Sequence, residues 1–125
     1  KFGVSLTATA LRWIRSTEQS AVLILSRDGF MDWAISSDKA RANGAFYRTK
    51  GRVVELPPGS LAADETIASN RSGDPISLNT WFKHAHRDAV AKEMKLVCEN
   101  YGYTLTLLSL SNGDKVWEPK EWGNA

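Results

Sequence analysis

The sequence predicts an α+β fold in which an antiparallel β-sheet is flanked by helices. Three observations favour this class. Apolar residues near the start recur at helical spacing, an apolar run ends at an Asp-Gly pair, and two strand-like runs near the end are joined by a short glycine-containing turn. The chain has 125 residues, of which 42% are hydrophobic and 24% charged, so it can form one globular domain with a sizeable core.

The first expected element is an amphipathic helix over residues 6–16. Gly3 suits a tight turn, and Ser5 suits an N-cap because its hydroxyl can accept a hydrogen bond from the first free amides. The face of this helix that we expect to be buried carries Leu6, Ala10, Trp13 and Ile14. The same face could instead pair two copies of the chain, so a homodimer through Phe2, Trp13 and Ile14 is a further expectation.

This opening is also typical of the DNA-reading half of a helix-turn-helix. A Phe-Gly-Val-Ser turn precedes the helix, and Arg12 and Arg15 lie off its apolar face. Similar turns join many helices that never contact DNA. Because the chain starts with Lys1 inside this pattern, we expect a piece of a longer protein, with residues 1–18 ending a helix-turn-helix-like segment.

A β-hairpin is predicted next, with strands over residues 21–26 and 30–35 and a turn at Asp28-Gly29. The first strand is apolar throughout, which predicts a central position covered on both faces. The second strand is mixed, and its Trp33 should be buried or line a pocket.

The middle of the chain predicts loops with little regular structure. Residues 36–51 are polar and rich in glycine and alanine around Phe46 and Tyr47, and residues 52–56 resemble a short strand. Ser60 could cap a short helix over residues 61–68. The Ser-Gly-Asp-Pro sequence at 72–75 should end any helix.

Two further strands are predicted over residues 90–99 and 103–110, joined by Asn100-Tyr101-Gly102. Residues 113–125 show no periodicity and should form a tail that is extended or partly mobile. The single cysteine, Cys98, cannot form an internal disulfide, and its apolar neighbours predict a buried thiol in a reducing compartment. We therefore expect a cytoplasmic protein, and no run approaches the roughly 20 apolar residues of a membrane span.

The sequence contains no recognisable catalytic motif. It lacks His-Glu-x-x-His, Cys-x-x-Cys, a glycine-rich phosphate loop and a Gly-x-Ser-x-Gly elbow. His84 and His86 could share one face of a strand and bind a metal with Asp88, but a metal site needs three or four protein ligands, and solvated imidazoles are the simpler interpretation. We expect no catalytic residue, no metal site and no cofactor in this chain.

Binding is the more plausible activity, and two kinds are open. A pocket for a small ligand or a protein partner is expected from aromatic, basic and imidazole side chains at Trp33, Phe46, Tyr47, Arg48, Trp81, His84 and His86. Nucleic acid is the alternative partner, because Arg12, Arg15 and the acid-free basic run over residues 39–52 could neutralise phosphates. The net charge of +2 does not require it.

Three segments resemble the region that follows the protease core of ImmA/IrrE-family zinc metallopeptidases. They are residues 2–13 (FGVSLTATALRW), 21–33 (AVLILSRDGFMDW) and 101–108 (YGYTLTLL), and the resemblance extends over about residues 1–110. In that family a zincin-like domain with His-Glu-x-x-His comes first, a helix-turn-helix-like segment follows, and some members end in a domain that resembles GAF sensor modules.

The resemblance implies that residues 19–112 form a GAF-like sensor or regulatory domain. Family members cleave helix-turn-helix repressors and thereby release stress genes or mobile-element genes. This chain would then sense a small-molecule signal or dock the repressor, while zinc would belong to the catalytic domain. Neither His84 nor His86 lies in the family's metal motif. The alternative is a stand-alone module that binds nucleic acid or a small ligand.

Overall fold

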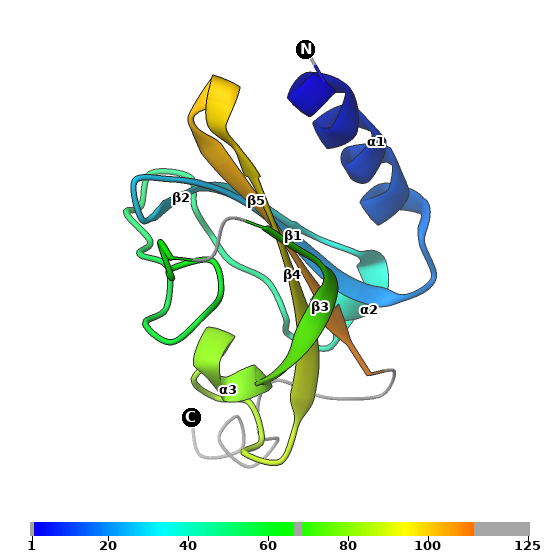
Figure 1. Cartoon of the computed structure of the whole chain (residues 1–125). Coiled ribbons are helices and arrows are strands. Elements are labelled where there is room, and N and C mark those ends of the chain that lie inside the picture. Colours follow the sequence, from blue (N-terminus) through cyan, green and yellow to red (C-terminus); the bar gives the residue numbers. More distant parts are fainter. Residues whose placement is uncertain (1, 67–68, 112–125) are drawn as a thin grey trace.

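The computed structural model describes residues 2–66 and 69–111, with side chains from residue 7 onward (Figure 1). Within these ranges an antiparallel sheet of five strands has the order β2-β1-β5-β4-β3, which confirms the predicted α+β class. The strands are β1 Ser20–Arg27, β2 Phe30–Ser36, β3 Ser69–Ser77, β4 Val90–Cys98 and β5 Tyr103–Leu110. The helices are α1 Phe2–Ser16, α2 Asp38–Ala42 and α3 Leu78–Trp81, and a 3₁₀ turn covers Glu99–Tyr101.

The predicted β1–β2 hairpin is confirmed. Asp28 and Gly29 both have positive φ, 52° and 86°, as a two-residue type I′ turn requires. Leu25 pairs with Trp33 and Ser26 with Met31, so Asp32 is the extra residue of a β-bulge. β1 is buried along nearly all its length between β2 and β5, as its apolar sequence predicts.

The sheet has a different cover on each face. On one face, here called the loop face, α2, α3 and the segment 45–63 pack over a core that includes Val22, Ile24, Leu108 and Leu110. On the other, the helix face, α1 places Ile14 against Leu23, Leu25 and Leu105. Figure 1 shows α1 (blue) on the opposite side of the sheet from the cyan and green connecting segments. The core is therefore two layers, one on each side of the sheet.

Helix α1 starts earlier than predicted. Its first residue is Phe2, so Gly3 and Ser5 lie within the helix, and the predicted turn and N-cap are wrong. A glycine inside a helix costs only about 1 kcal/mol relative to alanine, which is too little to break it. Trp13 is also not a core residue, because 37% of it is exposed. Only one side of the helix contacts the sheet, and the other side faces solvent. The buried stripe is therefore narrower than the predicted apolar face and consists of Ala10, Leu11 and Ile14.

Two predicted elements are replaced by irregular structure on the loop face. The strand over 52–56 is reduced to one bridge between Phe30 and Glu55, with Leu56 N donating to Gly29 O at 2.8 Å. The helix over 61–68 is a series of turns as far as residue 66, and the last two residues lie outside the described part of the chain. Ser60 does act as a cap, but of a turn: its Oγ accepts from Ala63 N at 3.2 Å.

Three elements were not predicted: the short helices α2 and α3 and the strand β3. α2 begins after Ser37, whose Oγ accepts a hydrogen bond from Ala40 N at 3.2 Å. β3 is polar and contains Gly73 and Pro75. An edge strand tolerates these residues, and within the described sheet β3 pairs only with β4, with a break in the pairing register between Asn70 and Asp74. α3 follows β3 directly. The predicted strands at 90–99 and 103–110 are confirmed as β4 and β5, and the predicted tail 113–125 lies outside the described residues.

No helix in the described ranges is both long enough and apolar enough to cross a membrane.

Candidate functional site

Two recesses open on the loop face of the sheet. The first, here called the aromatic recess, has a volume of about 690 Å³ and lies between residues 44–47, 53–58 and 79–84. The second, the turn recess, has a volume of about 750 Å³ and lies where the β1–β2 turn and the β4–β5 turn meet the segment 62–65. Glu55 and Leu56 line both recesses and form the wall between them.

The aromatic recess brings together Phe46, Tyr47, Trp81 and His84, four of the residues proposed from the sequence. Tyr47 stacks on Phe82 with ring centroids 4.9 Å apart, and its hydroxyl donates a hydrogen bond to Trp81 O. Burial raises the pKa of the Tyr47 phenol, so this hydroxyl stays protonated. Tyr47 and Trp81 therefore form a fixed inner wall.

The outer part of the aromatic recess is apolar with a basic edge. Val53 is 85% exposed and Phe46 is half-buried, so apolar surface faces solvent here. The guanidinium groups of Arg41 and Arg48 lie 5.8 Å and 6.0 Å from the centroid of the Phe46 ring, within the range of cation–π contacts. The predicted binding residue Arg48 is thus beside the recess and contacts one of its aromatic rings.

Another predicted binding residue, Trp33, lies elsewhere. Trp33 is on the helix face and packs in the same cluster as Ile14 and Leu25, so the sheet separates it from Tyr47 and Trp81. The cause is its register opposite Leu25, which is a helix-face residue. A bulky aromatic residue on a strand can point to either face of the sheet, and the sequence of the strand does not determine to which face it points.

The two histidines do not share a strand face as the metal hypothesis required. They flank the buried Ala85 in a turn that follows α3, and both are exposed. His86 Nδ1 accepts a hydrogen bond from Asp88 N at 3.1 Å and lies 3.8 Å from the Asp88 carboxylate. Across the part of the chain with described side chains, no three His, Cys, Asp or Glu residues come together in a way that could hold a metal ion.

The basic residues proposed for nucleic-acid binding are divided between two sides of the molecule. Arg12 and Arg15 are exposed on α1, which covers the helix face, whereas Arg41 and Arg48 lie beside the loop-face recess.

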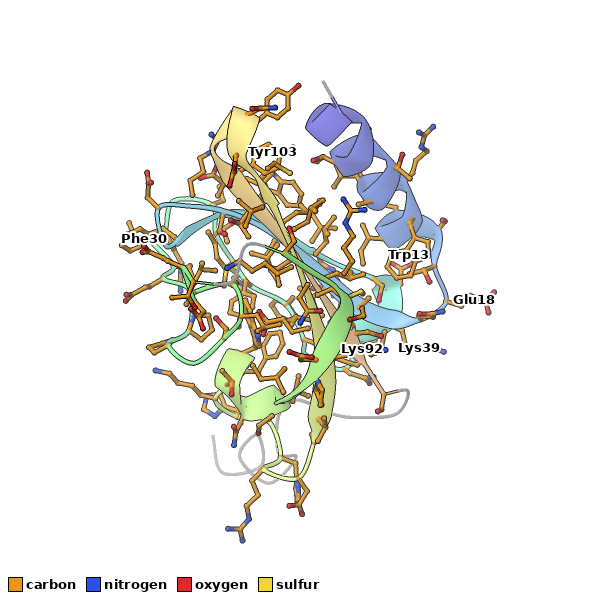
Figure 2. All side chains as sticks on the ribbon, in the orientation of Figure 1. Trp13, Glu18, Phe30, Lys39, Lys92 and Tyr103 are labelled. Carbon is orange, nitrogen blue, oxygen red and sulfur yellow. The ribbon has the colours of Figure 1, made fainter. Side chains whose placement is uncertain are left out.

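Trp13 borders a small apolar groove of about 250 Å³ on the helix face together with Met94 and Leu107. Figure 2 shows Trp13 on the α1 side and Phe30, at the turn recess, on the opposite side of the molecule.

The turn recess contains a buried cation. Lys95 of β4 is 3% exposed, and its Nζ donates a hydrogen bond to Asp64 O at 2.7 Å. Burial lowers the pKa of Lys95, and the nearby Asp64 and Glu93 carboxylates oppose this shift. Asp64 itself accepts hydrogen bonds from Thr66 Oγ1 at 2.6 Å and Thr66 N at 2.9 Å, which lower the pKa of its carboxyl group.

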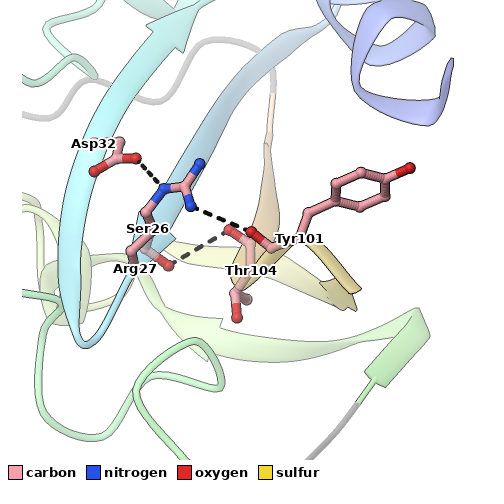
Figure 3. A network of polar contacts seen from close by, with 5 residues as sticks. All are labelled: Ser26, Arg27, Asp32, Tyr101 and Thr104. Atoms are coloured by element: carbon pink, nitrogen blue, oxygen red, sulfur yellow. Dashed lines mark hydrogen bonds and ion pairs between the residues drawn. The ribbon is translucent and has the colours of Figure 1, made fainter. Parts of the chain in front are cut away.

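One wall of the turn recess is fixed by Arg27 (Figure 3). Its Nε lies 2.6 Å from Asp32 Oδ2, and its terminal NH1 group donates to Tyr101 O at 3.2 Å. Beside it, Ser26 Oγ donates to Thr104 O at 3.5 Å. Arg27 thus ties the β1–β2 hairpin to the β4–β5 turn. Cys98, predicted to be buried, is half-buried and lines this recess, because it lies at the open end of β4.

Sequence reasoning did not find the turn recess. Lys95 and Glu93 alternate with Met94 and Leu96, a pattern that normally indicates a polar face in water. The available signal was weak: Ala91 and Val97 continue the charged face with apolar residues at both ends of the strand.

No protein-family model matches the chain, and the search of curated proteins gives no match either. The fold and its recesses therefore define the class of protein by themselves: an α+β domain with two ligand-sized recesses on one face of its sheet.

Proposed function

We propose that this chain is a non-catalytic regulatory domain of an ImmA/IrrE-type zinc metallopeptidase and that it binds a small-molecule signal in the aromatic recess. The observation that carries the proposal is the grouping of Phe46, Tyr47, Trp81 and His84 around one recess of about 690 Å³. This volume lies within the range of small-molecule sites, about 300–1,000 Å³. The resemblance of residues 2–13, 21–33 and 101–108 to the family supports the assignment, and so does an antiparallel sheet with flanking helices, as a GAF-like domain would have.

The chemistry of the recess favours a ligand with an aromatic or aliphatic body. Covering Val53 and Phe46 would remove apolar surface from water, which contributes about 25 cal/mol per Å². The hydroxyl of Tyr47 and the indole of Trp81 already donate hydrogen bonds within the chain, so they offer shape rather than new polar contacts. Arg41 and Arg48 at the edge would favour an acidic group on the ligand.

A thermal-shift screen of aromatic and aliphatic acids tests ligand binding. Binders should raise the unfolding temperature of the wild-type chain, and Phe46→Ala should weaken them about tenfold while the protein stays folded. Trp13→Ala is the matched control, because Trp13 is an exposed aromatic residue on the opposite face. The binding proposal fails if no compound stabilises the wild type, or if both variants lose binding equally.

A second experiment tests the link to a peptidase. The reading frame upstream of Lys1 should encode a helix with His-Glu-x-x-His, and the complete protein should contain zinc and cleave a helix-turn-helix repressor in the cytoplasm. An upstream sequence without that motif would remove the peptidase role and leave a separate ligand-binding domain.

A further inference from the structure

The turn recess has at its base a cation with unused hydrogen-bonding capacity. The Lys95 ammonium has three N–H donors, and Asp64 O accepts one of them. Among the side chains that the structure describes, no carboxylate lies within 4.0 Å of Lys95 Nζ as an ion pair. Buried ammonium groups are costly unless they are paired, so an acceptor from outside the chain would complete this site.

The nearest acidic residue on the same strand face is already engaged. Glu93 Oε1 accepts from Trp81 Nε1 at 3.1 Å, and its Oε2 accepts from Ala62 N at 2.8 Å. These two hydrogen bonds hold the carboxylate in place toward α3 and the segment 60–63. Glu93 therefore moderates the charge of Lys95 at a distance without occupying its remaining donors.

The rim of the recess has the opposite charge. Four exposed acidic residues line it, and among the residues that the structure describes the one basic residue there besides Lys95 is Arg27, which is bound to Asp32 and Tyr101 O. The rim carboxylates belong to Asp28, Glu55, Glu65 and Glu99. A ligand that is only anionic would be attracted by Lys95 but repelled by the rim, and one that is only cationic would experience the reverse.

A molecule that carries both charges satisfies both parts of the recess. The volume of about 750 Å³ accommodates ligands up to the size of a short peptide. Phe30, Leu56 and Val97 supply apolar surface between the buried cation and the acidic rim.

We propose that the turn recess is a second binding site, separate from the aromatic recess, for a zwitterionic small molecule of the amino-acid or short-peptide class. The ligand carboxylate accepts hydrogen bonds from Lys95 Nζ, and the ligand ammonium lies among the rim carboxylates. This site does not depend on the ligand of the aromatic recess.

Matched peptide probes test the charge requirement. A tripeptide library of residues with uncharged side chains and free termini serves as the zwitterionic probe, together with the amino acids that have uncharged side chains. The same library with acetylated N-termini is anionic, and the library with amidated C-termini is cationic. Thermal shift and calorimetric titration should detect binding of zwitterionic members, and each single-charge form should bind at least tenfold more weakly. Equal binding of the blocked and free forms would overturn the proposal, as would no binding of any zwitterion.

Two variants locate the site. Lys95→Met keeps the length of the stem and removes the charge, so it should weaken zwitterion binding at least tenfold. Lys92→Met is the control, because Lys92 is exposed and lies on the opposite face of the same strand. If Lys95→Met misfolds, Glu65→Gln combined with Glu99→Gln tests the rim instead, and it should weaken zwitterions but strengthen the N-acetylated library.

The two proposals fail separately. Phe46→Ala should leave zwitterion binding unchanged, because Phe46 lies outside the turn recess. Loss of zwitterion binding in Phe46→Ala with no effect of Lys95→Met would place the ligand in the aromatic recess and overturn this inference, while the proposed function would stand.

Discussion

Trp81 and Glu93 are joined by a buried hydrogen bond, with the indole Nε1 3.1 Å from Oε1 of the carboxylate. The other oxygen of Glu93 accepts from Ala62 N at 2.8 Å. Trp81 lines the aromatic recess and Ala62 lines the turn recess. One fully buried carboxylate therefore connects the walls of the two recesses, so a shift of either wall changes a hydrogen bond that the other wall shares.

The first prediction concerns this carboxylate. Glu93→Gln keeps the shape of the side chain, but its amide group cannot accept a hydrogen bond through nitrogen, so one buried N–H loses its partner. We expect the free energy of unfolding to fall by about 1–3 kcal/mol. Urea unfolding measures it, with the exposed Glu18→Gln as a control that should change stability by less than about 0.5 kcal/mol. Equal effects of the two substitutions would contradict a structural role for Glu93.

The second prediction concerns a buried hydroxyl. Within the described residues, Thr106 Oγ1 is buried and has no hydrogen-bond partner. Thr106→Val replaces this hydroxyl with a methyl group of similar size, so stability should rise by about 1 kcal/mol. Thr7→Val should have the opposite effect, because Thr7 Oγ1 lies 2.8 Å from the Tyr103 hydroxyl. A lower melting temperature for Thr106→Val would indicate that this hydroxyl has a partner in solution, such as an ordered water molecule.

The third prediction concerns pH. Burial holds the pKa of Lys95 in the folded chain below its ordinary value of 10.5. At pH values between the lowered pKa and 10.5, the unfolded chain therefore binds a proton that the folded chain has released. The contribution of Lys95 to stability should therefore increase as the pH rises through this window, and below it the full cost of burying the ammonium group applies. Lys95→Met should remove the increase, whereas Lys92→Met should keep it.

Urea midpoints from pH 7 to 10.5 measure this dependence as the difference between Lys95→Met and Lys92→Met, because that difference cancels the ionisation of tyrosine near pH 10 in the unfolded chain. Above about pH 10 Tyr47 has the opposite effect: its raised pKa keeps the folded state protonated, and stability falls as the pH rises. Identical pH profiles for wild type and Lys95→Met would contradict the shifted pKa of Lys95.

The fourth prediction separates backbone strain from steric clash. Gly73 has φ of +85°, and a Cβ there would lie 2.7 Å from Lys92 Cγ; Gly51 has φ of +72° with no atom within 4 Å of such a Cβ. Gly51→Ala should cost about 1–2 kcal/mol from strain alone, and Gly73→Ala should cost more. Adding Lys92→Ala should recover the difference, as a double-mutant cycle of melting temperatures would show. No recovery would mean that the extra cost comes from Met94, whose Cγ would lie 3.0 Å from the same Cβ, and not from Lys92.

The sequence allowed the prediction of those parts of the fold that local pattern determines. The Asp28-Gly29 turn has the residues that positive φ demands, and the apolar β1 and the alternating β5 have strong strand composition. β3 was missed because its polar sequence has low strand propensity. It pairs with β4 through contacts distant in sequence, and its edge position tolerates Pro75.

The candidate site was predictable only in part. Exposed-looking aromatic residues near the middle of the chain pointed to the aromatic recess, whereas Trp33 was misplaced because the side of a strand that faces a given cover is a tertiary property. The turn recess was not found, because the segment 60–64 folds over β4 and supplies Ala62 N and Asp64 O to Glu93 and Lys95. Those backbone partners make the burial of two charged residues possible.

The backbone of the wall shared by the two recesses makes few hydrogen bonds to the strands, although the Leu56 side chain is buried in the loop-face core. Met31 N donates to Val54 O and Leu56 N donates to Gly29 O, each at 2.8 Å, beside the single bridge at Glu55. A segment held by so few bonds opens at a lower free energy than the central strands, so the Leu56 amide should exchange its hydrogen long before those of β1 and β5. We expect each opening event to displace Glu55 and Leu56, which line both recesses, and so to change the shape of the two recesses together.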